Sequence, residues 1–139
     1  MGKRTWVDSD FWSDTGDLTD DEKVVYLYLL TNQQRSIAGY YKLNIRYMAF
    51  DLGVTEARLM KTLTRDQKYW KYDAETSQVL IPKFTRYNIV KSKQQIAAMN
   101  AELAKLKPSP LHKMFIDSFV EVNGIGSEAL IDDKLKYSL

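Results

Sequence analysis

The chain has 139 residues and a net charge of +2, with 45% hydrophobic and 27% charged residues. These values favour one globular domain with appended segments and argue against wholesale disorder. The absence of cysteine excludes a disulfide scaffold, a thiol nucleophile and cysteine-based metal sites, and it fits a reducing compartment. The single histidine, His112, leaves few other metal or acid–base arrangements, and we expect it to be a surface or half-buried side chain.

No segment has the pattern of a membrane span or a secretory signal. The longest purely apolar or aromatic run, Val24–Leu30, has seven residues, whereas a spanning helix needs roughly 20. Trp6, Asp8 and Asp10 occupy the positions where a secretory signal has its apolar core. We therefore expect a cytoplasmic protein that does not contact a membrane.

Charge is unevenly distributed along the chain. The net charge is −5 over residues 1–22, +4 over 23–82, +5 over 83–107 and −2 over 108–139. A basic middle between acidic ends is typical of a nucleic-acid-binding module, because the local field attracts phosphate more than the total charge does. Solvated helix faces give the same counts, so this alternative stays open.

The first predicted elements are a helix and a short strand. Thr19 and Glu22 have the spacing of a capping box directly before an apolar stretch, which predicts a helix over 20–31. A polar segment ending in Gly39 is followed by Tyr40-Tyr41-Lys42-Leu43, a short stretch with two aromatic residues that predicts a small strand.

Two helices joined by a tight turn follow. Asn44 can cap a helix over 45–52 that stops at Gly53, and Thr55 can cap a second helix over 56–67. Leu59 and Leu63 lie one turn apart, so we expect them on the buried side. A tight turn containing glycine between two helices is the helix-turn-helix signature.

The rest of the chain predicts a hairpin and two more helices. The hairpin has strands over 69–72 and 79–82 around a polar tip, and 84–88 is a further extended or connecting piece. An amphipathic helix over 91–106, a proline break at Pro108 and Pro110 and a short helix over 111–122 follow. Residues 123–139 have no periodicity and are interpreted as a tail or a partner-bound segment.

The order of these elements predicts a mainly α fold with a small β-hairpin wing (α+β), a winged helix-turn-helix with an added C-terminal helix. We divide the chain into an acidic aromatic arm (1–18), a winged-helix domain (19–88), an amphipathic basic helix (89–107), and a short helix with a tail (108–139).

Several short stretches between Trp6 and Asn88 resemble one family. They are Phe11-Trp12, Tyr28–Asn32, Ala38–Tyr41, Leu52–Glu56, Lys71–Asp73, Leu80-Ile81 and Tyr87-Asn88. The chain resembles the amino-terminal winged-helix domain of phage replisome organisers and DnaD-like replication proteins. Tyr69-Trp70 departs from the small turn residue that relatives have before the first wing strand.

The resemblance implies a role in initiating phage or plasmid-type DNA replication in a bacterial host cell. It implies binding of double-stranded origin DNA, self-assembly into homo-oligomers, and recruitment of replication proteins such as the helicase or its loader. No second, carboxy-terminal DnaD-type domain is recognisable, so the single-strand binding and helicase-loader contacts of that part are not carried over.

The candidate DNA-binding residues lie on the second helix of the predicted pair and after it. Arg58, Lys61, Thr62 and Arg65 are spaced i, i+3, i+4 and i+7, which places three cations and a hydroxyl on one stripe. Lys68 and Lys71 extend this set toward the hairpin. A solvated helix face is the alternative. For Tyr69, Trp70 and Tyr72, packing in the hairpin core is favoured over base stacking.

The candidate oligomer interface combines the aromatic arm with the basic amphipathic helix. Its residues are Phe11, Trp12, Ile96, Met99 and Leu103. The alternative function is a winged-helix adaptor that oligomerises or binds a host protein without reading DNA. Salt separates the two, because phosphate contacts weaken steeply with ionic strength whereas an apolar interface does not.

We expect no enzymatic activity, no cofactor and no metal site. No grouping of nucleophile, base and oxyanion donors is recognisable from the spacing. The aspartates of the arm lack calcium-loop spacing, because Trp12 stands at a ligand position. Gly124–Ser127 lacks the third glycine and the lysine of a phosphate loop, so we interpret it as a flexible turn.

Overall fold

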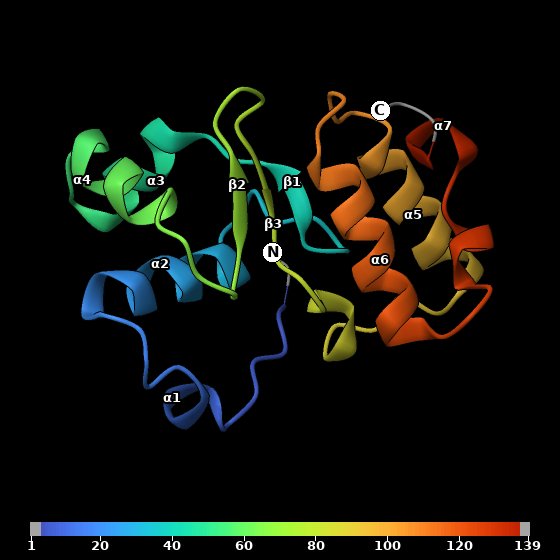
Figure 1. The fold of residues 1–139 in the computed structure, drawn as a ribbon, viewed down its shortest axis with the longest axis horizontal. Helices are drawn as coiled ribbons and strands as arrows, with labels where there is room; N and C mark the ends of the chain where they lie inside the picture. Colours follow the sequence, from blue (N-terminus) through green and yellow to red (C-terminus); the bar gives the residue numbers. More distant parts are fainter. Residues whose placement is uncertain (1–3, 137–139) are drawn as a thin grey trace.

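Helices and three short strands alternate along the chain (Figure 1). The computed structural model describes residues 4–136. In chain order the elements are α1 (Phe11–Asp14), α2 (Asp20–Thr31), β1 (Tyr40–Lys42), α3 (Ile45–Leu52), α4 (Glu56–Leu63), β2 (Lys71–Asp73), β3 (Gln78–Leu80), the 3-10 helix η1 (Phe84–Arg86), α5 (Lys93–Leu103), α6 (Leu111–Asn123), the 3-10 helix η2 (Ser127–Leu130) and α7 (Asp133–Lys136). The strands form one antiparallel sheet in the order β1-β3-β2. The expected mainly helical α+β class is confirmed.

The helix ends follow from the residues at the caps. The Thr19 hydroxyl accepts a hydrogen bond from the Glu22 amide at 3.2 Å, and the Glu22 carboxylate accepts one from the Thr19 amide at 2.9 Å. Gly53 ends α3 in the left-handed region with φ +67°, and Thr55 caps α4. These predicted boundaries are confirmed, since capping is a local property of sequence.

The sheet is a middle layer with helices on both faces (Figure 1). Tyr41 and Val79 are register partners whose side chains belong to the core shared with α2, α3 and α4. Tyr40 and Leu80, also partners, point to the opposite face and belong to the core shared with α5, α6 and α7. Alternating side chains of β1 and β3 therefore join two hydrophobic cores.

The first core holds α4 and the start of the hairpin together. Leu59 and Leu63 are buried, as predicted, and Trp70 is fully buried. The Trp70 indole donates a hydrogen bond to the Leu63 carbonyl at 3.0 Å. Packing in the core, the interpretation favoured for this tryptophan, is confirmed.

The second core includes a segment that the sequence did not reveal. Ile131 and Leu135 are buried against α5 and α6. The Asn100 side chain donates to the Leu130 carbonyl at 2.9 Å and accepts from the Asp132 amide at 3.1 Å. The segment 124–136, interpreted from the sequence as a tail or a partner-bound segment, therefore packs against its own chain. Its apolar contacts come from two short turns that have no helical period to detect.

Several element boundaries differ from the prediction, and the end of α4 differs most. Helix α4 ends at Leu63 and does not reach Gln67, because the Gln67 carboxamide oxygen accepts from the Tyr69 and Trp70 amides at 2.7 and 2.9 Å. These bonds turn the chain, and β2 begins at Lys71. The segment 84–88, interpreted as an extended or connecting piece, contains η1.

His112 is buried, contrary to expectation. Its Nδ1 atom lies 2.6 Å from the Tyr40 hydroxyl, and desolvation by burial lowers the pKa of this imidazole. The sequence around His112 does not indicate this contact, because Tyr40 lies 72 positions away. Among residues 4–136, no helix is long and apolar enough to cross a membrane.

Candidate nucleic-acid interface

Helix α4 lies at the end of the molecule opposite α5, α6 and α7 (Figure 1). Leu59 and Leu63 hold its apolar side against the first core. The other side presents Lys61 to solvent, together with Arg58 and the flanking Arg65. This helix therefore has one buried side and one exposed, cationic side.

Arg58 is exposed but paired. Its Nη2 and Nε atoms donate to the two carboxylate oxygens of Asp21 at 2.7 and 3.1 Å. The guanidinium holds the pKa of the Asp21 carboxyl below its usual range, and the carboxylate raises the pKa of Arg58. An ion pair between two exposed side chains stabilises a protein little, so a phosphate can replace Asp21 as the partner of this arginine.

The remaining residues of the predicted stripe do not all lie on it. Thr62 is buried, and its hydroxyl donates to the Arg58 carbonyl at 3.3 Å. Arg65 lies beyond the C-cap residue Thr64 of α4, with one guanidinium nitrogen 3.9 Å from a Glu22 carboxylate oxygen. The prediction that places Thr62 on the exposed stripe is therefore wrong, because α2 packs against this flank of α4.

The two lysines before and within the hairpin contact neighbouring groups. The Lys68 ammonium lies 5.4 Å from the centre of the Tyr69 ring. The Lys71 ammonium donates to the Gln67 carbonyl at 2.8 Å and lies 3.8 Å from an Asp66 carboxylate oxygen. Lys71 is thus partly committed to the turn that ends α4, while Lys68 remains exposed.

The hairpin tip is acidic. Asp73 and Glu75 lie there, and residues 73–78 contain no cation. A hydrogen bond from Ser109 is the main cause that holds the pKa of the Asp73 carboxyl below its ordinary value, and a hydrogen bond from Thr76 lowers it further. Positive charge is therefore concentrated on α4 and just after it, and not on the hairpin tip.

The residues predicted for an oligomer interface are mostly internal. Phe11 is buried beside the Tyr26 ring, with the two ring centres 5.5 Å apart. Met99 and Leu103 are buried in the second core, and Ile96 packs against it. These four side chains face their own chain. Trp12 remains 64% exposed.

Two exposed aromatic residues on α3 were not predicted from the sequence as functional residues. Tyr47 is 64% exposed and Phe50 is 86% exposed. They lie one turn apart, on the side of α3 that faces away from the buried Met48 and Ala49. The sequence feature that could have indicated this pair is Phe50, an aromatic residue outside the apolar stripe of its own helix.

The described residues contain no group of three or more histidine or acidic side chains that could hold a metal ion. Comparison of the chain with protein-family models, with curated proteins and with solved structures found no match.

Proposed function

We propose that the chain is a DNA-binding, self-associating winged-helix module of a phage-type replication initiation protein, acting in the cytoplasm of a bacterial host. The element order α2-β1-α3-α4-β2-β3 and the strand order β1-β3-β2 support this proposal. In a winged helix-turn-helix, α3 and α4 are the helix pair, and α4 is the helix that approaches the major groove.

One observation carries the proposal. Arg58 and Lys61 are exposed on the outer side of α4 and Arg65 is exposed just beyond its end, while Leu59 and Leu63 anchor the same helix in the core. Lysine and arginine side chains neutralise backbone phosphates and release counterions, which supplies most of the affinity for DNA. An arginine can also contact both acceptors of a guanine edge.

Charge reversal on α4 tests the proposal. The double variant Arg58→Glu/Arg65→Glu should lose binding to duplex DNA that encodes the protein's own replication region, measured by gel shift and anisotropy. The salt dependence of any remaining binding should be flatter, because fewer phosphates are contacted. Lys113→Glu/Lys134→Glu, which reverses two exposed cations on α6 and α7, is the matched control.

Stability is measured in parallel. The melting temperature should stay nearly unchanged, since exposed substitutions usually act within about 0.5 kcal/mol. If the α4 double variant binds DNA as tightly as the parent chain at low salt, α4 does not contact DNA and the proposal fails.

A protein-interaction adaptor is the second candidate function. The exposed Tyr47 and Phe50 favour it, because aromatic side chains are enriched at the centres of protein interfaces. The Asp21 carboxylate beside Arg58 also opposes phosphate. Sedimentation of the parent chain and of Phe50→Ser tests this candidate. Self-association that Phe50→Ser abolishes, combined with no DNA binding by the parent chain at low salt, would make the adaptor the better assignment.

A further inference from the structure

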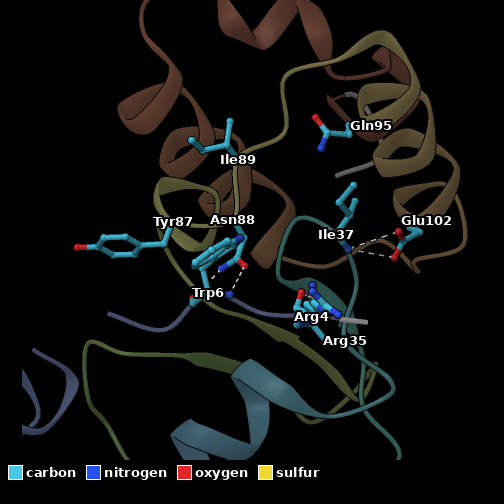
Figure 2. A pocket seen from close by; sticks show the side chains of 9 residues that line it. All are labelled: Arg4, Trp6, Arg35, Ile37, Tyr87, Asn88, Ile89, Gln95 and Glu102. Atoms are coloured by element: carbon cyan, nitrogen blue, oxygen red, sulfur yellow. Dashed lines mark hydrogen bonds between the residues drawn. The ribbon is translucent and has the colours of Figure 1, made fainter. Parts of the chain in front are cut away.

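A cleft of 480 Å³ lies between the N-terminal arm and α5, away from α4 (Figure 2). Arg4 and Trp6 of the arm form one side of it, and Ile37 and Ile89 form another. Gln95 and Glu102 reach toward it from α5. Four segments that are distant in sequence therefore meet around one space.

The backbone of the arm is fixed by side chains of the folded body. The Trp6 amide donates to the Asn88 carboxamide oxygen at 2.8 Å, and the Asn88 carboxamide nitrogen donates to the Trp6 carbonyl at 3.2 Å (Figure 2). The buried Arg35 donates to the Arg4 carbonyl at 2.8 Å and stacks over the Phe84 ring. These bonds hold the cleft open without covering its apolar side chains.

Three apolar side chains at the cleft are exposed although their backbone is anchored. Trp6 is 75% exposed, Tyr87 is 50% exposed and Ile89 is 60% exposed. Trp6 and Tyr87 also line a second, smaller cleft toward α1, so the indole stands between two hollows. Clustered exposed apolar side chains with polar neighbours are typical of an interaction site.

The surroundings of the cleft are cationic. Residues 83–95, which include part of its wall, contain four lysines and arginines and no acid. Arg86, Lys91 and Lys93 are exposed, and among the described residues they have no carboxylate within ion-pair distance. The acid that lines the cleft, Glu102, accepts long hydrogen bonds from the Ile37 amide at 3.3 and 3.4 Å.

We propose that this cleft binds an acidic peptide segment of a partner protein, with one large apolar side chain inserted beside Trp6, Ile37 and Ile89. Acidic residues on either side of that anchor face Arg86, Lys91 and Lys93. The anchor supplies most of the affinity, because a few buried aromatic contacts dominate small interfaces. The charges supply steering and salt dependence.

The lining favours a peptide over single-stranded nucleic acid. A base has polar edges that need partners, whereas two isoleucines line this space and the Asn88 carboxamide is already bonded to the arm. The Glu102 carboxylate can accept from a peptide N–H group. An aliphatic or aromatic side chain matches the isoleucine wall without leaving polar groups unpaired.

The test uses the full chain and a fluorescein-labelled eight-residue peptide, six residues of which are acidic, with a tryptophan at its centre. Its anisotropy should rise with protein concentration, and the affinity should fall with salt. Trp6→Ala should weaken binding about tenfold. Lys91→Glu/Lys93→Glu should weaken it severalfold and reduce the salt dependence.

Matched controls separate this site from the proposed DNA interface. Trp12→Ala removes an exposed tryptophan that does not line the cleft, and Lys61→Glu/Lys68→Glu reverses two cations at α4. Both variants should bind the peptide like the parent chain, and the second should lose DNA affinity. A peptide whose tryptophan is replaced by serine should not bind.

Four results would overturn the proposal. The first is no peptide binding by the parent chain at 1 mM, and the second is equal losses with Trp6→Ala and Trp12→Ala. Another is tighter binding of oligothymidine that displaces the peptide. The last is self-association of the parent chain, seen in sedimentation, that Trp6→Ala abolishes, since the cleft would then hold a second copy.

Discussion

Gly39 and Gly53 form a matched pair for testing how closely the chain packs against Phe84. Both have positive φ, +75° and +67°. A Cβ atom at Gly39 would lie 2.5 Å from the Cβ and Cγ atoms of Phe84, whereas a Cβ at Gly53 meets nothing within 4 Å. The substitutions Gly39→Ala and Gly53→Ala therefore share backbone strain and differ in steric overlap.

The expected losses follow from these two effects. Left-handed backbone strain costs an L-residue roughly 1–2 kcal/mol, and forcing an extra group into a packed core costs about 1–3 kcal/mol. Gly53→Ala should therefore reduce the free energy of unfolding by about 1–2 kcal/mol and Gly39→Ala by about 2–5 kcal/mol. Urea unfolding followed by the emission of the buried Trp70 measures both.

The Phe84 ring gives this prediction a second readout. It lies 5.3 Å below the Arg35 guanidinium, which in turn donates to the Arg4 carbonyl. Moving Phe84 should therefore loosen the arm and weaken peptide binding in Gly39→Ala but not in Gly53→Ala. Equal unfolding free energies for the two variants, within about 0.5 kcal/mol, would refute the close contact between Gly39 and Phe84.

Three further predictions concern the charge pair, the buried histidine and the C-terminal half. Asp21→Asn should raise DNA affinity a few-fold at constant salt in anisotropy titrations, because Arg58 no longer has a competing carboxylate; unchanged or weaker affinity would argue against a DNA contact by this arginine. The pKa of His112 is lowered from 6.5 by burial, so the folded state favours the neutral imidazole. The contribution of this side chain to the free energy of unfolding is therefore fully present above pH 6.5. It is lost as the pH falls through the lowered pKa. Chemical unfolding between pH 7.5 and 4.5 should show that loss in the parent chain, and His112→Gln should reduce it. A chain shortened to residues 1–90 should lose cooperative thermal unfolding by circular dichroism, because Tyr40 and Leu80 would lose the helices that bury them; a sharp transition would show that the first core is sufficient.

Local rules explain why much of the fold was predictable. The Thr19 cap, the Gly53 stop and the Thr55 cap each depend on residues within one helical turn. The burial of Leu59 and Leu63 follows from helical spacing. Features of this kind need no knowledge of the partner element.

The candidate site was less predictable because its contacts join distant positions. Arg58 and Asp21 are 37 positions apart. Their opposite charges alone do not identify them as partners. The helical stripe placed Thr62 beside Arg58, yet α4 has eight residues and its flank turns toward α2. Which flank of a short helix is buried depends on the neighbouring helix, and spacing within α4 does not contain that information.

The hairpin connects the two cores and is a poor candidate for a DNA-contacting wing. The Gln78 carboxamide accepts from the Lys107 amide at 2.6 Å and donates to the Lys107 carbonyl at 3.1 Å. Ser109 donates to Asp73 at 2.6 Å. These bonds fix the hairpin against the start of α6, and the acids at its tip repel phosphate. DNA contact in the proposed function therefore depends on α4 and its flank. The cleft beside Trp6 is built from other segments, so it stays accessible while α4 is occupied.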